Sequence, residues 1–254
     1  MRICRVSLDD DLHYGVIEGD AVALLSSHPF GPFEPDGRVL PLADARLVAP
    51  VLPSKIIAVG KNYLDHVREM GGDTPPAEPM VFFKPSTAVI GPGDAILLPW
   101  QSEQVEHESE IAIVISRLCR DVPEERVEEV ILGYTCANDV TARDLQRTDG
   151  QWGRAKGFDT FCPLGPWIET SLDVEDATIE CTVNGEIRQS AVGGDMVHSV
   201  PELVAWISSV MTLLPGDVIL TGTPAGVGPL MAGDEVSVTI GGIGTLTNPV
   251  VDRG

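Results

Sequence analysis

Three acidic residues alternate with other side chains at the start of an apolar run. Glu106, Glu108 and Glu110 precede Ile111-Ala112-Ile113-Val114-Ile115. Because side chains alternate between the two faces of a strand, all three carboxylates are predicted to share one face. Like charges this close repel, and a divalent cation is the simplest compensating partner. Carboxylates without thiolates suit Mg²⁺ or Mn²⁺, with Ca²⁺ as a competitor. Periodicity does not select which acids bind the metal, and an exposed edge strand with protective charges is the alternative.

A further acid, Asp139, ends a β-like run that begins near Gly133 and precedes a polar, helix-like segment. Functional side chains are often displayed at such strand ends. Asn138 or Asp139 could equally cap the following helix, and local sequence favours neither role.

His66 and Glu69 follow the strand-like segment 56–59 and are one helical turn apart. A carboxylate at this spacing can fix the tautomer of an imidazole and raise its basicity, which gives a possible water-activating pair. A surface histidine beside a glutamate is the commoner arrangement.

Lys156 lies among aromatic and small residues, where a partly buried ammonium could polarise a carbonyl or stabilise an enolate. The alternative is a surface lysine whose stem covers apolar neighbours. The Gly-rich segment 220–228 offers backbone amides and hydroxyls suited to a substrate carboxylate, or forms only a tight turn.

The elements that must position these residues are mostly strands. Short β-like runs at 3–8, 14–18 and 21–25 predict a small antiparallel meander, and Gly-Asp turns precede further strands at 95–98, 218–220 and 235–238. The best helix candidates are 123–132, closed by Gly133, and 200–210, where Ser199 and Glu202 have capping-box spacing. We therefore predict an α+β fold, with a small β-rich N-terminal domain at 1–52 and a catalytic domain at 53–254.

Composition excludes several classes of partner. Asp and Glu outnumber Lys and Arg by 38 to 17 in the 254 residues, a net charge of −21, which repels nucleic acid and anionic membrane surfaces. The five cysteines are widely spaced without a CxxC pair, so we expect a reducing cytoplasm rather than disulfides. No secretion signal or anchor is visible in the sequence.

Taken together, seven separated segments resemble the fumarylacetoacetate hydrolase superfamily over residues 55–250. They are GKNYLDHVREM (60–70), FFKPSTAVIGPGD (82–94), EHESEIAIVI (106–115), GYTCANDVTARDLQ (133–146), RAKGFDTFCPLGPW (154–167), VNGEIRQ (183–189) and PGDVILTGTPAGVG (215–228). The resemblance implies a mixed β-sandwich roll, usually assembled as a homodimer.

The resemblance also assigns roles to particular residues. It implies that Glu108, Glu110 and Asp139 hold Mg²⁺ or Mn²⁺, which leaves Glu106 outside the metal site. It further implies that Lys156 is the active-site lysine, that His66 and Glu69 form the catalytic pair of a lid, and that substrate contacts come from Arg143, Gln146 and Thr223.

The expected function is that of a metal-dependent hydrolase that cleaves a carbon–carbon bond in 2-oxo acids with a second carbonyl nearby, of the acylpyruvate or fumarylpyruvate type. Oxaloacetate decarboxylation and isomerisation of 2-hydroxyhepta-2,4-diene-1,7-dioate use the same enolate chemistry and are the alternatives. A non-catalytic metabolite-binding protein is the rival from another class, although pure binding does not require a base.

Overall fold

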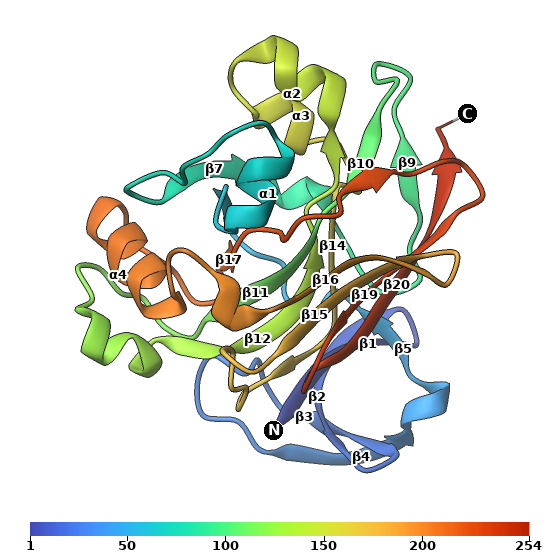
Figure 1. Cartoon of the computed structure of the whole chain (residues 1–254). Helices are drawn as coiled ribbons and strands as arrows, with labels where there is room; N and C mark the ends of the chain where they lie inside the picture. Colours follow the sequence, from blue (N-terminus) through green and yellow to red (C-terminus); the bar gives the residue numbers. More distant parts are fainter. Residues whose placement is uncertain (254) are drawn as a thin grey trace.

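The computed structural model describes residues 1–253, and most of the chain in them forms β-strands (Figure 1). The N-terminal segment is an antiparallel meander, as predicted. Its elements are β1 (Arg2–Leu8), β2 (Asp11–Glu18), β3 (Ala21–Leu25), β4 (Pro35–Pro41), a 3-10 turn (Leu42–Asp44) and β5 (Arg46–Val48). Strand β1 pairs with β14 (Cys162–Glu169), so the meander continues the largest sheet of the molecule.

The largest sheet follows the order β4-β3-β2-β1-β14-β12-β11-β17-β6-β7, with β5 joined to β1 and β8 joined to β14. Its remaining strands are β6 (Ile56–Gly60), β7 (Met80–Lys84), β8 (Val89–Ile90), β11 (Ser109–Ile115), β12 (Ile131–Asn138) and β17 (Val218–Leu220). Strands β11 and β12 lie at its centre, where neighbours on both sides satisfy their backbone hydrogen bonds.

A five-stranded sheet, in the order β16-β15-β19-β20-β9, packs against the large sheet. Its strands are β9 (Ile96–Leu98), β15 (Thr178–Val183), β16 (Glu186–Val192), β19 (Glu235–Ile240) and β20 (Gly244–Asp252). A small third sheet joins β10 (Val105–His107), β13 (Thr141–Ala142) and β18 (Gly228–Pro229). The sequence-predicted strands at 95–98, 218–220 and 235–238 are thus present.

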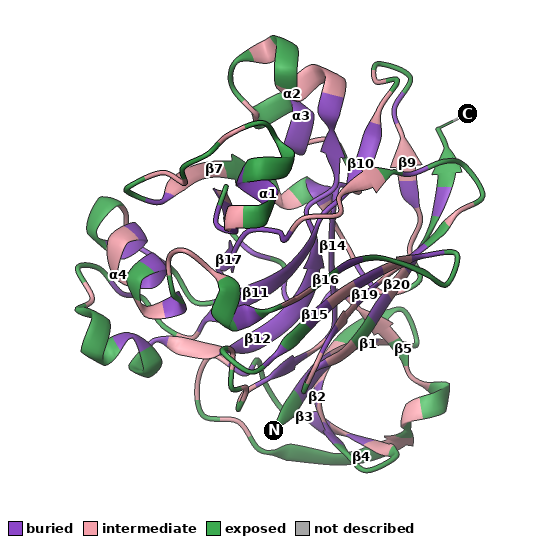
Figure 2. Cartoon of the chain, in the orientation of Figure 1, coloured by how far each residue is buried: buried purple, intermediate pink, exposed green. Residues whose placement is uncertain are grey.

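Strand β11 shows why the core has two layers. Ile111, Ile113 and Ile115 belong to the apolar cluster between the two sheets, whereas Ala112 and Val114 belong to the cluster on the opposite face. Both faces of the strand are buried (Figure 2), so its sequence is a continuous apolar run rather than an alternating one. This sandwich of sheets with few helices confirms the predicted α+β class.

The helices are short and lie outside the sheets. They are α1 (Leu64–Glu69), α2 (Arg143–Asp149), α3 (Gly153–Lys156) and α4 (Val200–Val210), with 3-10 turns at Ser86–Ala88, Glu124–Glu129 and Gly193–Asp195. Helices α1, α2 and α3 gather at one end of the molecule, near β7 and β10 (Figure 1). In the described residues, no helix is long and apolar enough to span a membrane.

One predicted helix is confirmed and another is wrong. Ser199 and Glu202 form the expected capping box at the start of α4. The segment predicted as a helix at 123–132 contains only a 3-10 turn, and β12 begins at Ile131. Gly133 does not close a helix, because it lies inside β12, where a Cβ atom would come within 2.4 Å of the Glu169 carbonyl oxygen. Its small size permits close approach of two strands rather than a helix end.

Candidate active site

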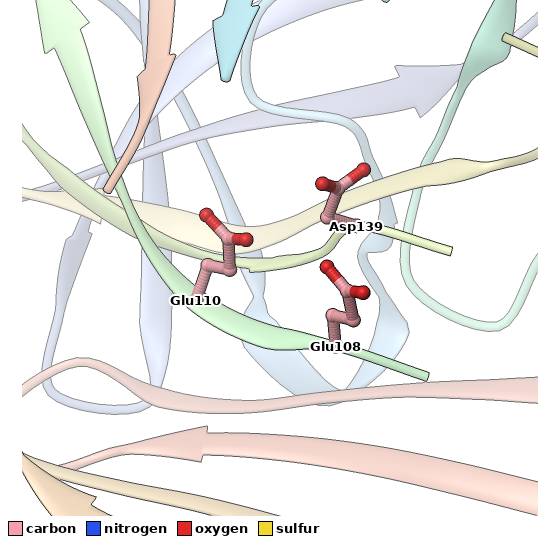
Figure 3. Close-up of side chains that lie close together, drawn as sticks. All are labelled: Glu108, Glu110 and Asp139. Atoms are coloured by element: carbon pink, nitrogen blue, oxygen red, sulfur yellow. The ribbon is translucent and has the colours of Figure 1, made fainter. Parts of the chain in front are cut away.

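Three of the acidic residues meet where two central strands end. Glu110 lies in β11, Glu108 immediately precedes that strand, and Asp139 immediately follows β12. The antiparallel register pairs Ser109 with Asn138, and the Asp139 amide donates to the Glu108 carbonyl at 2.8 Å. Carboxylate oxygens of the three acids therefore lie within 4.8 Å of one another, and the side chains turn toward a common space (Figure 3).

The three acids are almost fully buried, with 1 to 4% of their surface exposed. The alternative of an exposed edge strand is therefore wrong, because β11 has neighbours on both sides. The alternative that Asn138 or Asp139 caps the next helix is also wrong. Helix α2 begins after Ala142 and has no side-chain cap.

Glu106 is separated from the cluster by a break in the strand. It lies in β10, which pairs in a different sheet from β11. Its carboxylate accepts hydrogen bonds from Nε2 of the Gln104 side chain at 2.5 Å and from Nε of Arg143 at 2.7 Å. Both oxygens of Glu106 are thus engaged, which agrees with its place outside the acid cluster.

Buried cations surround the acids. Nζ of Lys156 donates to Glu108 and to Asp139, each at 2.6 Å. Nη2 of Arg143 donates to Glu108 at 2.5 Å. Lys156 is only 2% exposed, so the alternative of a surface lysine is wrong.

Sequence reasoning missed one of these cations. Lys84 is 1% exposed and donates to Asp139 at 2.5 Å and to the Val140 carbonyl at 3.3 Å. It ends strand β7, within the segment FFKPSTAVIGPGD. A lysine directly after two phenylalanines at the end of a strand was the available signal.

The charges of the group do not balance. Four buried carboxylates, those of Glu106, Glu108, Glu110 and Asp139, face three buried cations, those of Lys84, Lys156 and Arg143. Glu110 is the acid that forms no ion pair with any described residue, and it accepts a hydrogen bond from the Gly222 amide at 2.6 Å. One buried carboxyl group is therefore left without a cationic partner.

The pKa values reflect this imbalance. Burial raises the pKa of Glu110 well above its usual value, and the carboxylates of Asp139 and Glu108 raise it further. Burial also opposes ionisation of Glu108, but Lys156 and Arg143 outweigh it and lower the pKa of that carboxyl. For Lys156, burial disfavours the ammonium, yet Asp139 and Glu108 dominate and raise its pKa.

The donor set fits a hard divalent cation. The cluster offers carboxylate oxygens with no imidazole or thiolate among them, and one of its acids, Glu110, has no cationic partner among the described residues. Glu108, Glu110 and Asp139 are the residues that would hold the ion, and their geometry suggests a divalent metal site without selecting the metal.

His66 and Glu69 lie together on α1, as their spacing predicted. Nδ1 of His66 is 3.1 Å from Oε2 of Glu69, and His66 is 6% exposed. Oε1 of Glu69 accepts a hydrogen bond from the Gly226 amide at 3.0 Å. Gly226 has a φ of +100°, and a Cβ atom there would come within 2.1 Å of the Arg188 carbonyl oxygen, so only glycine fits. The Gly-rich segment thus holds the glutamate that orients the histidine.

The residues expected to contact substrate all lie on one small cavity, but each also has protein partners. Arg143 donates through Nη1 to Gln146 at 2.6 Å. The Thr223 hydroxyl donates to the Ser109 carbonyl at 2.9 Å and accepts from Gln189 at 2.7 Å. Substrate contact by Arg143, Gln146 and Thr223 stays a prediction.

The cavity brings the acids and the His66 pair together. Its lining consists of Val59, Gly60, Lys61, His66, Met70, Phe82, Glu108, Glu110, Asp139, Arg143, Gln146, Trp152, Lys156 and Thr223. Its volume is about 50 Å³. One water molecule needs roughly 10–15 Å³ by this measure, so the cavity has room for a few waters.

Several known proteins are similar to this chain in sequence and in fold. The structure of 2-hydroxyhepta-2,4-diene-1,7-dioate isomerase from Mycobacterium marinum is 51% identical to this chain, with a TM-score of 0.93. The match covers 100% of this chain and 99% of the isomerase. The bovine mitochondrial oxaloacetate tautomerase FAHD2A is 43% identical over 226 residues, which are 84% of this chain and 72% of that protein. Maleylpyruvate hydrolase from Sphingobium sp. SYK-6, solved with manganese(II) and pyruvate, is 33% identical with a TM-score of 0.83, and each chain covers 100% of the other.

Two family patterns account for almost the whole chain. Residues 1–50 match the Rv2993c-like N-terminal family. Residues 55–251 match the fumarylacetoacetate hydrolase C-terminal family. The chain therefore belongs to the fumarylacetoacetate hydrolase family.

Proposed function

We propose that this protein is a metal-dependent enzyme that interconverts a 2-oxo acid and its enol by moving a proton at the carbon next to the carbonyl. The observation that carries the proposal is the shared cavity: His66, already oriented by Glu69, lines the same small space as Glu108, Glu110 and Asp139. A base and a site for a divalent cation that face one cavity are the two components that enolisation requires.

The metal's contribution is electrostatic. Mg²⁺ or Mn²⁺ held by Glu108, Glu110 and Asp139 would supply a Lewis acid toward the carboxylate and carbonyl oxygens of a 2-oxo acid. The manganese and pyruvate in the maleylpyruvate hydrolase structure support this choice of ligand for a related protein.

The side chains of the chain supply the proton transfer. With Nδ1 of His66 donating to Glu69, its Nε2 is the nitrogen left to accept a proton from the substrate carbon and to return it. Lys156 places a fixed ammonium beside Glu108 and Asp139, where it would stabilise negative charge that develops on the substrate oxygen. Phe82 and Trp152, in edge contact with ring centroids 5.2 Å apart, line the cavity and limit the access of water.

We prefer proton transfer to hydrolysis because the relatives that are named for proton transfer have the higher sequence identity to this chain. The isomerase and the tautomerase are 51% and 43% identical to this chain, whereas the maleylpyruvate hydrolase is 33% identical. The sequence-based preference for hydrolysis of acylpyruvate or fumarylpyruvate is retained as the second candidate. It is favoured by the His66 pair, because the same base could activate a water molecule for attack on a distal carbonyl.

A substrate panel tests the proposal. The purified protein, loaded with Mg²⁺ or Mn²⁺, would be given the enol of oxaloacetate, an acylpyruvate and fumarylpyruvate, with the loss of enol absorbance followed and the products identified by NMR. Ketonisation of enol oxaloacetate without cleavage supports tautomerisation. Release of pyruvate together with a second acid supports hydrolysis instead. Tight binding of these acids without conversion would support the rival of a metabolite-binding protein.

A further inference from the structure

Lys61 differs from the other cations of the cavity. It lies in the short connection between β6 and α1 and lines the cavity with His66 and Met70. Lys84, Lys156 and Arg143 are buried and bonded to the acids, whereas Lys61 is exposed and forms no hydrogen bond or ion pair with any residue that the structure describes. It is the cavity cation that is free to meet an anionic group from solution.

The backbone holds Lys61 in an unusual conformation. Its φ of +60° is in the left-handed region, which lysine rarely adopts. The next residue, Asn62, is 1% exposed and anchors the connection. Its side-chain nitrogen donates to the backbone carbonyls of His198 at 3.0 Å and Thr221 at 2.8 Å. Its side-chain oxygen accepts a hydrogen bond from the backbone N–H of His198 at 2.8 Å. A long charged side chain is thus fixed at its base at the edge of the cavity, at a position where asparagine or glycine would cost less strain.

Charge balance gives such a lysine a role. The buried group carries one more carboxylate than cations, so a bound divalent ion leaves one excess positive charge. The carboxylate of a 2-oxo acid neutralises that charge. A second carboxylate on the same substrate has no buried cation left to pair with, and its entry would be unfavourable unless an additional cation met it.

We propose that Lys61 binds the carboxylate at the far end of a 2-oxo dicarboxylic acid and so selects such acids over 2-oxo acids whose far end is uncharged. The assignment rests on the proposed function, and it adds the residue that distinguishes substrates. An exposed lysine at the cavity edge also acts on the approaching substrate, because the net charge of the chain otherwise repels a dianion.

Two substrates that differ at the far end test the assignment. Oxaloacetate and 2,4-dioxopentanoate share the 2-oxo acid group, but the second ends in an uncharged methyl ketone. Lys61→Asn removes the charge, and asparagine tolerates the positive φ at this position. In the Mn²⁺-loaded variant, KM for oxaloacetate should rise about tenfold, which is the low end of the range for the loss of a hydrogen bond between charged groups. KM for 2,4-dioxopentanoate should stay the same, and Lys61→Arg should restore most of the preference.

A binding measurement separates recognition from turnover. Calorimetric titration of the Mn²⁺-loaded protein with pyruvate and with 2-oxoglutarate should show that Lys61→Asn weakens only the dicarboxylate, again by about tenfold. Arg68→Gln is the matched control, since Arg68 is an exposed cation on α1 that pairs with Asp65, and it should change neither acid.

The outcomes distinguish this assignment from the proposed function. If Lys61→Asn weakens both acids equally, or neither, Lys61 does not read the second carboxylate although the proposed function stands. If the wild-type protein neither binds nor converts any of these acids, both the Lys61 assignment and the proposed function are wrong.

Discussion

Nζ of Lys156 lies 2.6 Å from Oδ2 of Asp139, although the two residues are 17 positions apart, Lys156 at the end of α3 and Asp139 just after β12. The same ammonium donates to Glu108 at 2.6 Å. Two of the three carboxylates that would bind a metal are therefore already held by a buried lysine. Lys156 and a divalent cation draw on the same negative charge, and this competition makes the site testable.

Replacing Lys156 with methionine should separate stability from metal binding. Loss of one partner of a buried ion pair costs about 3–5 kcal/mol, so the metal-free variant should unfold at lower urea concentration than the wild type. Manganese should then stabilise the variant more than it stabilises the wild type, because the carboxylates have lost a competing cation. Equal stabilisation of both proteins by manganese would contradict this view of Lys156.

Glu110 should be necessary for metal binding, and Glu106 should not. At a metal concentration of 100 times Kd, binding stabilises the folded state by about 2.7 kcal/mol. For a chain of this size, that corresponds to a rise in Tm of roughly 5–10 °C. Glu110→Gln should abolish the rise, which differential scanning calorimetry would measure.

Glu106→Gln is the matched control, because it removes an acid from the same stretch of chain that is bonded to Gln104 and Arg143. It should keep the metal-induced rise in Tm. A lost rise in Glu106→Gln, together with a normal one in Glu110→Gln, would mean that the metal ligands are assigned to the wrong acids.

The stability of the metal-free protein should depend on the ionisation of Glu110. Its pKa is raised in the folded state by burial and by Asp139 and Glu108, so its contribution to stability is fully present below the ordinary glutamate pKa and is lost as pH rises through the folded value. A bound metal ion stabilises the ionised carboxylate of Glu110, so the metal binds better where Glu110 is ionised. The rise in Tm caused by manganese should therefore grow with pH, measured from pH 5 to 8.

The matched measurement uses Glu110→Gln without metal. The wild type should lose stability relative to this variant as pH increases, since only the wild type must bury a charge. A difference between the two proteins that is independent of pH over that range would show that Glu110 is ionised throughout.

His66 should act in proton transfer and not in metal binding. His66→Gln should lower kcat by about 10²–10⁴, the usual contribution of general acid–base catalysis, while the rise in Tm with manganese is kept. Glu69→Gln should have a smaller effect in the same direction, because Glu69 orients the imidazole through one hydrogen bond. If His66→Gln lost hydrolysis of an acylpyruvate but kept tautomerisation of oxaloacetate, the base would serve water activation only.

Local patterns predicted most of the strands, but they left open which acids belong to the cluster. The apolar run after Glu110 required burial on both faces, and the register of β11 with β12 then placed Asp139 beside Glu108. Strand periodicity could not exclude Glu106, because the break at Glu108 between two sheets depends on distant partners. The resemblance to a known family made that distinction.

Lys84 and the segment 123–132 show what local patterns leave out. Lys84 becomes a site residue only because β7 and β12 end near each other in space, which a single stretch of sequence does not record. The acidic segment at 124–129 has helix-forming residues, but β12 claims the chain from Ile131 for the central sheet and limits it to a 3-10 turn. Tertiary packing decided both cases.

The most direct measurement of the central claim is the rate at which enol oxaloacetate becomes its keto form, followed by the loss of enol absorbance, in the metal-free and metal-loaded protein. We expect no acceleration above the buffer rate after chelation, full recovery on addition of Mg²⁺ or Mn²⁺, and no recovery in Glu110→Gln. Undiminished acceleration by the metal-free protein, or by Glu110→Gln, would contradict the claim that Glu108, Glu110 and Asp139 hold a cation for enol chemistry.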